Sequence, residues 1–91
     1  LYALRVRGHS MIDALVDDGD LIVIQPTTSV TDGEMAVAWL KEENEATLKR
    51  IYNEGTVIRL QPANTQMAPL FVSPENLEVQ GRVVAVLRTI V

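Results

Sequence analysis

Short apolar runs alternate along the chain with clusters of turn-forming residues, and this pattern predicts an almost entirely β protein. Strands are expected over residues 2–7, 21–24, 35–40, 46–52, 56–60, 77–79 and 82–91. The intervening turns at residues 17–20, 31–33 and 53–55 are rich in Asp, Asn and Gly. Only residues 10–15 favour a helix, in the form of one short turn that starts at Ser10.

Three stretches have a more particular pattern. Residues 21–24 are continuously apolar, as in a strand buried on both faces, and Pro26 ends that run. Residues 61–74 contain Pro62, Pro69 and Pro74 and are predicted to be irregular. The apolar run at residues 83–91 is compatible with either a central strand or an exposed edge, and an uncovered apolar edge would promote aggregation.

The composition fits one small domain. The chain has 91 residues, of which 47% are hydrophobic and only 4% aromatic, so aliphatic side chains must form the core. A net charge of −4 argues against this segment gripping a nucleic-acid backbone by itself. Without cysteine, and with a single histidine, we expect no disulfide, metal site or cofactor, and the chain suits a reducing compartment. No apolar stretch approaches the ~20 residues of a membrane span.

Ser10 and Lys49 are the residues most suggestive of chemistry. A serine hydroxyl becomes a good nucleophile only when a nearby base takes its proton. His9 is the only histidine, but neighbouring side chains of an extended segment point to opposite faces, which keeps it from the Ser10 hydroxyl. A lysine from a distant strand can reach it, and Ser–Lys is a known nucleophile–base pair.

The strand around Lys49 suggests how such a base would be tuned. Because side chains alternate, Lys49 and Thr47 share one face, and Arg50 is expected to point outward into solvent. Burial would lower the pKa of Lys49 from its usual ~10.4 toward the neutral range that a base requires. The alternative is a surface lysine and a helix-capping serine, which are the commoner roles of these residue types.

The amino-acid sequence around these residues resembles that of the carboxy-terminal domain of the LexA repressors. That family of self-cleaving serine–lysine proteins also includes UmuD and phage repressors. The resemblance rests on the sequences LRVRGHSMID at residues 4–13, DGDL at 18–21, EATLKRI at 45–51, LQPAN at 60–64 and GRVVAVLR at 81–88. Type I signal peptidases use the same pair of residues, but nothing here resembles their membrane anchor.

The resemblance implies a fold and a role for each site residue. The fold would be mostly β, LexA/signal-peptidase-like, with small, strongly curved sheets and little helix. Ser10 would be the nucleophile and Lys49 the general base. The backbone amides of His9 and Ser10 would form the oxyanion hole, while Thr47 would hydrogen-bond the neutral lysine. The His9 side chain would be a bystander or a specificity residue.

Other residues have more ordinary explanations. Met11 is expected to pack beneath the serine turn. Asp18 and Asp20 fit turn chemistry better than a calcium site, which needs more ligands. Trp39 is expected in the core or at a dimer edge. Residues 61–74 are expected to border the substrate groove.

The resemblance also implies a function. Residues 1–91 would be the single carboxy-terminal domain of a transcriptional repressor. This domain would be a latent serine endopeptidase and a dimerisation module. The repressor would be cytoplasmic and would control the SOS response to DNA damage. It would form a homodimer around residues 83–91 and bind its operator DNA through a separate amino-terminal domain. RecA-type filaments would stimulate its self-cleavage.

The resemblance also places the bond that would be cut. Family members cut an Ala-Gly or Cys-Gly bond upstream of the serine, and neither pair occurs here, so we expect the cleavage loop and DNA-binding domain to lie outside this chain. The alternatives are a UmuD-like accessory protein of a translesion polymerase and a catalytically dead dimerisation module.

Overall fold

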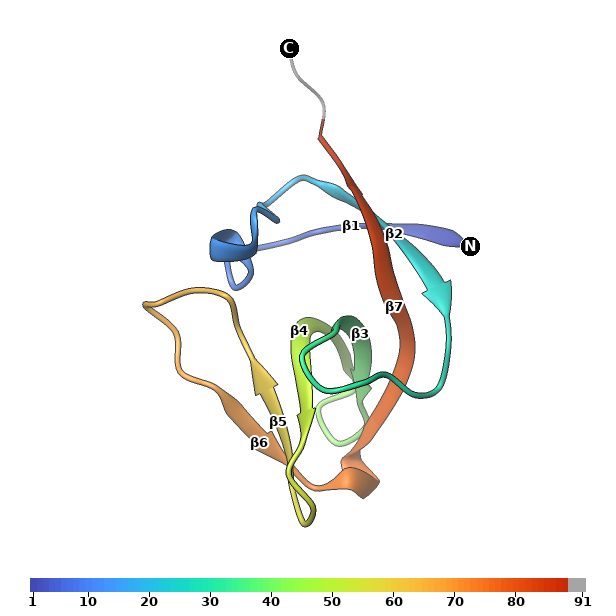
Figure 1. Ribbon diagram of the computed structural model, residues 1–91, viewed down its shortest axis with the longest axis vertical. Helices are drawn as coiled ribbons and strands as arrows, with labels where there is room; N and C mark the ends of the chain where they lie inside the picture. The colour runs from blue at the N-terminus through green and yellow to red at the C-terminus, as the bar shows by residue number, and fades with distance from the viewer. Residues whose placement is uncertain (89–91) are drawn as a thin grey trace.

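The computed structural model describes residues 1–88, which form one antiparallel sheet of seven strands and two short 3-10 helices (Figure 1). The strands are β1 (Tyr2–Arg5), β2 (Leu21–Pro26), β3 (Met35–Leu40), β4 (Glu45–Asn53), β5 (Ile58–Gln61), β6 (Leu70–Val72) and β7 (Leu77–Leu87). The helices are η1 (Ile12–Ala14) and η2 (Pro74–Asn76). The prediction of a mostly β fold is confirmed. Neither helix in this part of the chain has the length and apolar character needed to cross a membrane.

Strand β7 joins the two halves of the sheet, whose order is β1-β2-β7-β3-β4-β5-β6. Its second half pairs with β2 and its first half with β3, and each ladder contains a register shift. Figure 1 shows β7 running along the molecule from the β3–β4 region to the β1–β2 ladder. A bulge bends a strand and increases its twist, so these shifts explain how one sheet curves strongly enough to enclose a core.

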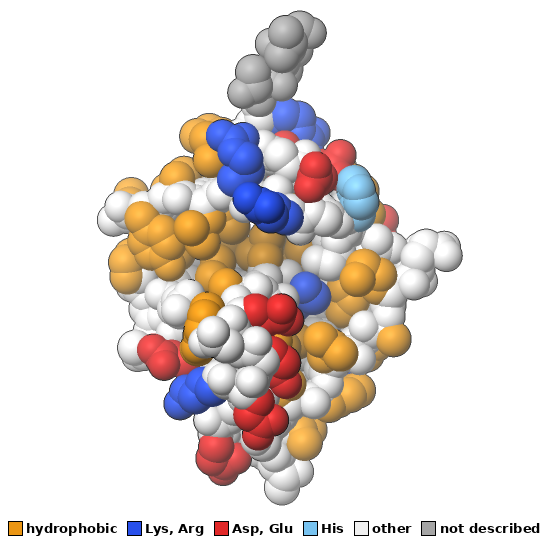
Figure 2. All heavy atoms as spheres, turned by 180° about the vertical axis from the view of Figure 1, so that it is seen from behind, with side chains coloured by type: hydrophobic (Ala, Val, Ile, Leu, Met, Phe, Trp, Pro, Cys, Tyr) orange, Lys and Arg blue, Asp and Glu red, His pale blue; other side chains and the backbone are white. Residues whose placement is uncertain are grey.

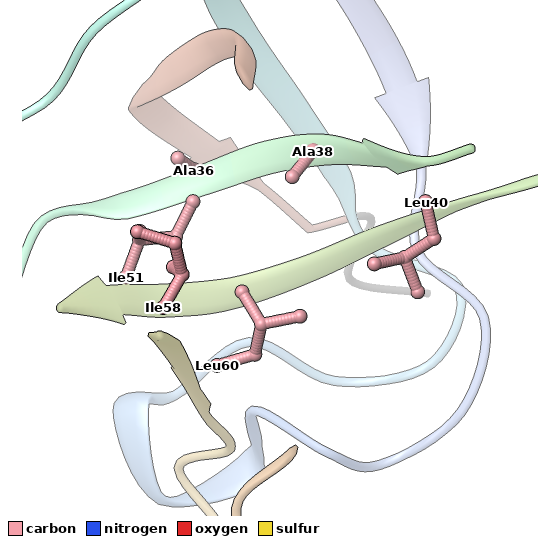
Figure 3. Packing of buried hydrophobic residues seen from close by; sticks show 6 residues of the cluster. All are labelled: Ala36, Ala38, Leu40, Ile51, Ile58 and Leu60. Carbon is pink, nitrogen blue, oxygen red and sulfur yellow. The ribbon is translucent and has the colours of Figure 1, made fainter. Parts of the chain in front are cut away.

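Both faces of β3 are buried, which divides the core into two clusters. Ala36, Ala38 and Leu40 pack on one side with residues of β4 and β5, as Figure 3 shows. Val37 points to the other side, because side chains alternate along a strand. The first cluster consists of Ala36, Ala38, Leu40, Ile51, Ile58 and Leu60. The second consists of Met11, Val16, Ile22, Ile24 and Val37, and it lies under the segment that carries Ser10.

Several predicted elements are wrong in detail. The region 61–74 is not wholly irregular, because it contains β6, and η2 is a second helical turn that the sequence did not indicate. The two predicted final strands form one continuous strand, β7, while residues 89–91 lie outside the described part of the chain. The first strand ends at Arg5 rather than at residue 7, and the helical turn begins at Ile12 rather than at Ser10.

Candidate active site

The structure brings Ser10 and Lys49 into direct contact. Ser10 lies in the turn between β1 and η1, and Lys49 lies in the middle of β4, 39 residues later in the chain. The Lys49 ammonium donates a hydrogen bond to Ser10 Oγ over 3.1 Å. Both side chains are half-buried, so the contact is partly shielded from water while Ser10 can still be approached.

Two further oxygen atoms hold the Lys49 amine. Nζ donates to Thr47 Oγ1 over 2.8 Å and to the backbone carbonyl of Leu48 over 3.1 Å. An ammonium has three N–H donors, and these three oxygens satisfy all of them. A neutral amine has two donors and one lone pair. The carbonyl and Thr47 can keep the two donors, which leaves the lone pair to accept a hydrogen bond from the Ser10 hydroxyl. The geometry therefore accommodates both protonation states.

Burial lowers the pKa of Lys49 below its ordinary value, because the ammonium loses part of its hydration. The negative charge of the exposed Glu45 acts in the opposite direction and raises the pKa. Desolvation is the larger effect. Lys49 therefore loses its proton more readily than a surface lysine does.

The turn that carries Ser10 is anchored from both sides. Met11 is buried beneath it, with 1% of its surface exposed, and its sulfur accepts a hydrogen bond from the Ala63 amide. The Asn64 side chain donates to the carbonyl of His9 over 2.8 Å. The Thr65 amide donates to a carboxylate oxygen of Asp13 over 2.9 Å. Met11 thus packs as the sequence predicts, and residues 63–65 support the serine turn.

The His9 side chain contacts Asp17 and not Ser10 or Lys49. Its side chain is 67% exposed, and Nδ1 lies 2.9 Å from Oδ1 of Asp17. The backbone amides of His9 and Ser10 donate to no acceptor within residues 1–88. The Gly8 amide, in contrast, donates to Asp18 Oδ1 over 2.8 Å. Adjacent backbone amides without an acceptor are the kind of donors that bind a developing negative charge on a substrate oxygen.

A cavity of about 250 Å³ opens beside Ser10 and Lys49. Its walls come from β1, β2, β3 and β4 and from the segment after β1. They consist of Leu4, Arg5, Val6, Arg7, Ser10, Ile22, Val37, Ala46, Thr47, Leu48 and Lys49. Figure 2 shows a hollow on this side of the molecule, where hydrophobic side chains lie below basic ones. Residues 61–74 do not line this cavity, and their expected place at the border of a substrate groove stays a prediction.

One wall of the cavity has an open strand edge. Residues 45–49 of β4 pair with β3 on one side, whereas β5 pairs with β4 only from Arg50 onward. The backbone groups on the other side of residues 45–49 therefore have no strand partner within the described chain. An extended peptide could add to this edge next to Ser10, as peptides do on exposed sheet edges elsewhere.

The acidic turn after η1 is held by its own hydrogen bonds. Asp20 is 3% exposed and accepts from the Asp17 amide and from Arg88. Hydrogen bonds from Arg88 and from the Asp17 amide lower the pKa of Asp20 to about 2. Within residues 1–88, no group of three or more His, Cys, Asp or Glu side chains could hold a metal ion. Asp18 and Asp20 both accept hydrogen bonds from backbone amides, Asp18 from Gly8 and Asp20 from Asp17.

Sequence reasoning missed several of these contacts. Arg50 is half-buried and donates to the Gly33 carbonyl over 3.0 Å, so the prediction of a solvated Arg50 is wrong. The supporting roles of Asn64 and Asp13 depend on contacts across more than fifty residues, which no local pattern reveals. For Arg88 there was one sequence signal, since it is the only charged residue in the apolar run at 83–91. Trp39 is half-buried on β3, opposite Ala46 of β4.

Comparison with known proteins gives consistent results. Residues 1–84 match the family model described as Peptidase S24-like. The LexA repressor of Roseiflexus sp. (strain RS-1) is 49% identical over 89 residues, which cover 98% of this chain and 41% of the relative. The LexA repressor of Herpetosiphon aurantiacus is 51% identical over 90 residues, covering 99% of the chain and 42% of the relative.

A third relative shows a similar degree of identity. The LexA repressor of Clostridium botulinum (strain Langeland) is 47% identical over 88 residues, which cover 97% of the chain and 42% of the relative. The chain therefore spans about two fifths of the length of the curated relatives that it matches.

Proposed function

The chain belongs to the S24-like peptidase family, and from this we propose that it is the catalytic and dimerisation part of a self-cleaving transcriptional repressor. The observation that carries the proposal is the 3.1 Å contact between Lys49 Nζ and Ser10 Oγ, with Thr47 at 2.8 Å from the same nitrogen. In this role Ser10 is the nucleophile, Lys49 the general base, and Thr47 a residue that orients the amine.

The first half of the proposed reaction acylates Ser10. The neutral amine of Lys49 accepts the hydroxyl proton while Ser10 Oγ bonds to the scissile carbonyl carbon. The carbonyl oxygen becomes an oxyanion, to which the amides of His9 and Ser10 donate hydrogen bonds. The oxyanion then collapses and the C–N bond breaks. The Lys49 ammonium gives its proton to the departing nitrogen, which leaves an acyl-Ser10 ester and a neutral lysine.

The second half hydrolyses this ester. A water molecule gives a proton to Lys49 as its oxygen attacks the acyl carbon, and the same two amides stabilise the second oxyanion. The bond to Ser10 Oγ breaks and the oxygen regains its proton from Lys49. The net reaction is the hydrolysis of one peptide bond, and both residues return to their starting protonation states.

The substrate in this proposal is a segment of the same protein. The curated relatives are LexA repressors, and the resemblance to that family points to an upstream Ala-Gly bond. Apolar side chains such as Leu4, Ile22 and Leu48 line the cavity beside Ser10, which suits a small apolar residue at the cleavage point. The open edge of β4 would hold the segment in an extended form.

The proposed biological context is the SOS response. A RecA-type filament would promote cleavage, and the repressor would bind operator DNA through an amino-terminal domain. The sequence upstream of this segment distinguishes the alternatives, because a helix-turn-helix domain indicates a repressor and a short tail indicates a UmuD-like polymerase accessory protein.

Self-cleavage of the full-length protein at alkaline pH, without any activator, tests the chemistry. Ser10→Ala should lower the rate by at least about 10³-fold, because no other group is positioned to attack. Ser73→Ala, which changes an exposed serine beside η2, is the matched control and should cleave at the normal rate. Normal cleavage by Ser10→Ala would exclude Ser10 as the nucleophile. An inert wild type would favour the dead dimerisation module.

The proposed homodimer uses the second half of β7. Residues 83–87 pair with β2 on one side, whereas β3 pairs with β7 only up to Arg82. The other side of this segment is an open edge within the described chain, and it carries the exposed side chains of Val84, Val86 and Leu87. A second copy that adds its own β7 would satisfy the backbone groups and cover the apolar surface.

A further inference from the structure

Arg88 connects the end of β7 to the turn that precedes Ser10. It directly follows β7, and its guanidinium donates to both carboxylate oxygens of Asp20, from Nε over 2.9 Å and from Nη2 over 2.8 Å. Nη2 also donates to the carbonyl of Leu15, just after η1, over 3.2 Å. Asp20 is the one buried carboxylate among the described residues, and a buried charge is costly unless it is paired.

From Asp20 the contacts continue toward the nucleophile. Asp20 accepts a hydrogen bond from the amide of Asp17, whose carboxylate in turn contacts His9 Nδ1 and accepts from the Asp18 amide. The Asp18 carboxylate accepts from the Gly8 amide, two residues before Ser10. In Figure 2 the single histidine lies beside acidic side chains, with basic side chains at the same end of the molecule.

Backbone contacts join the same two segments. The Val6 amide donates to the carbonyl of Asp20, and the Gly19 amide donates to the carbonyl of Val6. These hydrogen bonds connect the acidic turn and the residues before Ser10 into one unit. The Arg88–Asp20 pair adds a side-chain link between this unit and the residue after β7, next to the point where Leu21 of β2 pairs with Leu87 of β7.

We propose that Arg88, through its ion pair with Asp20, is a positioning residue for Ser10 and for the two backbone amides beside it. The inference rests on the proposed peptidase function, because it concerns the placement of that site. Arg88 does not touch Ser10. It keeps the acidic turn in place, and the turn keeps Gly8 and His9 in the conformation in which the amides of residues 9 and 10 face a substrate oxygen.

The consequence is a specific kinetic effect. Displacing an oxyanion donor or a nucleophile by about 1 Å can lower a rate by about 10²-fold. The base stays in place, because Lys49 has no contact with Arg88 or Asp20, and Thr47 Oγ1 and the Leu48 carbonyl still hold its amine when Ser10 shifts. Loss of the ion pair should therefore lower the maximal rate without moving its pH midpoint.

The test uses the 91-residue chain and a fluorophosphonate probe that acylates reactive serines, with the labelling rate followed against pH. Arg88→Gln should lower the plateau rate by at least about tenfold and leave the midpoint unchanged. Arg88→Lys should retain an intermediate rate, because an ammonium cannot contact both oxygens of Asp20 as a guanidinium does. Arg59→Gln, which breaks the pair between Arg59 of β5 and Glu54 of the preceding turn, is the matched control and should label normally.

A second measurement, amide hydrogen exchange at Gly8 at a temperature where all variants are folded, separates the possible outcomes. Faster exchange in Arg88→Gln but not in Arg59→Gln, together with slower labelling, supports the proposal. Normal labelling in folded Arg88→Gln overturns it, because the ion pair then serves stability alone. If the wild-type chain is not labelled, the proposed peptidase function fails. Unchanged Gly8 exchange in Arg88→Gln would separately overturn the proposal that Arg88 positions the segment before Ser10.

Discussion

The burial of Lys49 has opposite consequences for the stability of the fold and for the chemistry proposed for this residue. Its burial lowers its pKa, which means that the folded state favours the neutral amine more than the unfolded state does. At neutral pH the folded protein therefore bears the cost of a partly desolvated ammonium. The same cost makes the amine available as a base when the pH rises. Functional sites often contain such a residue, whose burial shifts its pKa at a cost in stability.

The base proposed for Lys49 predicts how self-cleavage depends on pH. Activity should rise as the pH increases through the lowered pKa of Lys49 and then level off, because only the neutral amine can accept the Ser10 proton. Lys49→Arg should be as inactive as Lys49→Ala, since arginine keeps its proton in proteins. Rates of the full-length protein between pH 6 and about 11 would show this. Full activity of Lys49→Arg would exclude Lys49 as the base.

Replacing Lys49 with an uncharged side chain should stabilise the fold. Lys49→Met removes the charge and keeps most of the side-chain volume, so its free energy of unfolding at neutral pH should exceed that of the wild type. The sign follows from the lowered pKa: the penalty is complete below the folded-state value and disappears as the pH rises to the unfolded value near ~10.4. Urea unfolding of both proteins at pH 7 and near pH 10.5 measures the difference. A gain that is equal at both pH values would show that it does not come from the charge.

The ion pair of Asp20 predicts that the stability of the fold decreases in acid. Its folded pKa is about 2, below the unfolded value of ~3.9, so the ionised carboxylate stabilises the fold above that unfolded value. This contribution is lost as the pH falls through the window from about 4 to about 2. Asp20→Asn should therefore lower the melting temperature at pH 6 and lower it much less near pH 2. A constant difference across this range would contradict the ion-pair explanation.

Ser10 and Lys49 could be found from the sequence because each lies within a motif with fixed neighbours. The motif also implied their proximity, which the structure shows directly. The contacts that hold the turn could not be found in this way. Asn64 reaches His9 and Arg88 reaches Asp20 from 55 and 68 residues away, and such pairings exist only once the sheet has formed.

At the scale of the elements, β7 depends on the lack of a side chain at Gly81. This residue pairs with Pro26 of β2 and with Val37 of β3, where the two ladders overlap. A Cβ atom here would collide with the buried side chain of Ile24 and lie 2.8 Å from the carbonyl oxygen of Gln25. The backbone carbonyl cannot move without breaking the sheet, so β7 can cross both neighbours only with glycine at this point.

Gly81→Ala should therefore destabilise the fold, by about 1–3 kcal/mol, as overpacking of a close-packed core does. Gly55→Ala is a useful comparison, because a Cβ there would meet no atom within 4 Å, although its positive φ brings a separate strain. Chemical denaturation of the two variants measures the change in the free energy of unfolding. Equal stability of Gly81→Ala and the wild type would show that β2 can move away from β7.

The same glycine explains why the sequence suggested two final strands. Gln80 and Gly81 interrupt the apolar pattern, and glycine usually weakens a strand, although here it allows the strand to continue. Strand β6 was hidden for a different reason. It has only three residues, it lies between Pro69 and Pro74, and its side chains at Leu70 and Phe71 are exposed. Long apolar runs such as residues 35–40 were predictable because their burial and their pattern agree.

At the scale of the whole molecule, β1 exposes Tyr2 and Leu4 by 37% and 38%, and two other apolar surfaces of the sheet are more exposed and have no partner in the described chain. One is β6 at the end of the sheet, where Leu70 and Phe71 are 52% and 57% exposed. The other is the second half of β7, where Val84 and Val86 are 49% and 40% exposed. The side chains of the two surfaces have similar exposed fractions, so exposure does not decide which surface forms the dimer interface. The proposed dimer uses β7, because five consecutive residues, 83–87, have an open backbone edge there and only three residues form β6.

Two matched charge substitutions distinguish these surfaces. Val86→Lys would place an ammonium in the proposed interface and should weaken the dimer by at least about tenfold, or ~1.4 kcal/mol. Phe71→Lys removes a comparably exposed apolar side chain from β6 and should leave the dimer intact. Sedimentation equilibrium of the wild type and both variants gives the dissociation constants. A wild type that stays monomeric at high micromolar concentration would contradict the dimer. A monomeric Phe71→Lys beside a dimeric Val86→Lys would move the interface to β6, because each charge disrupts only the surface in which it is buried.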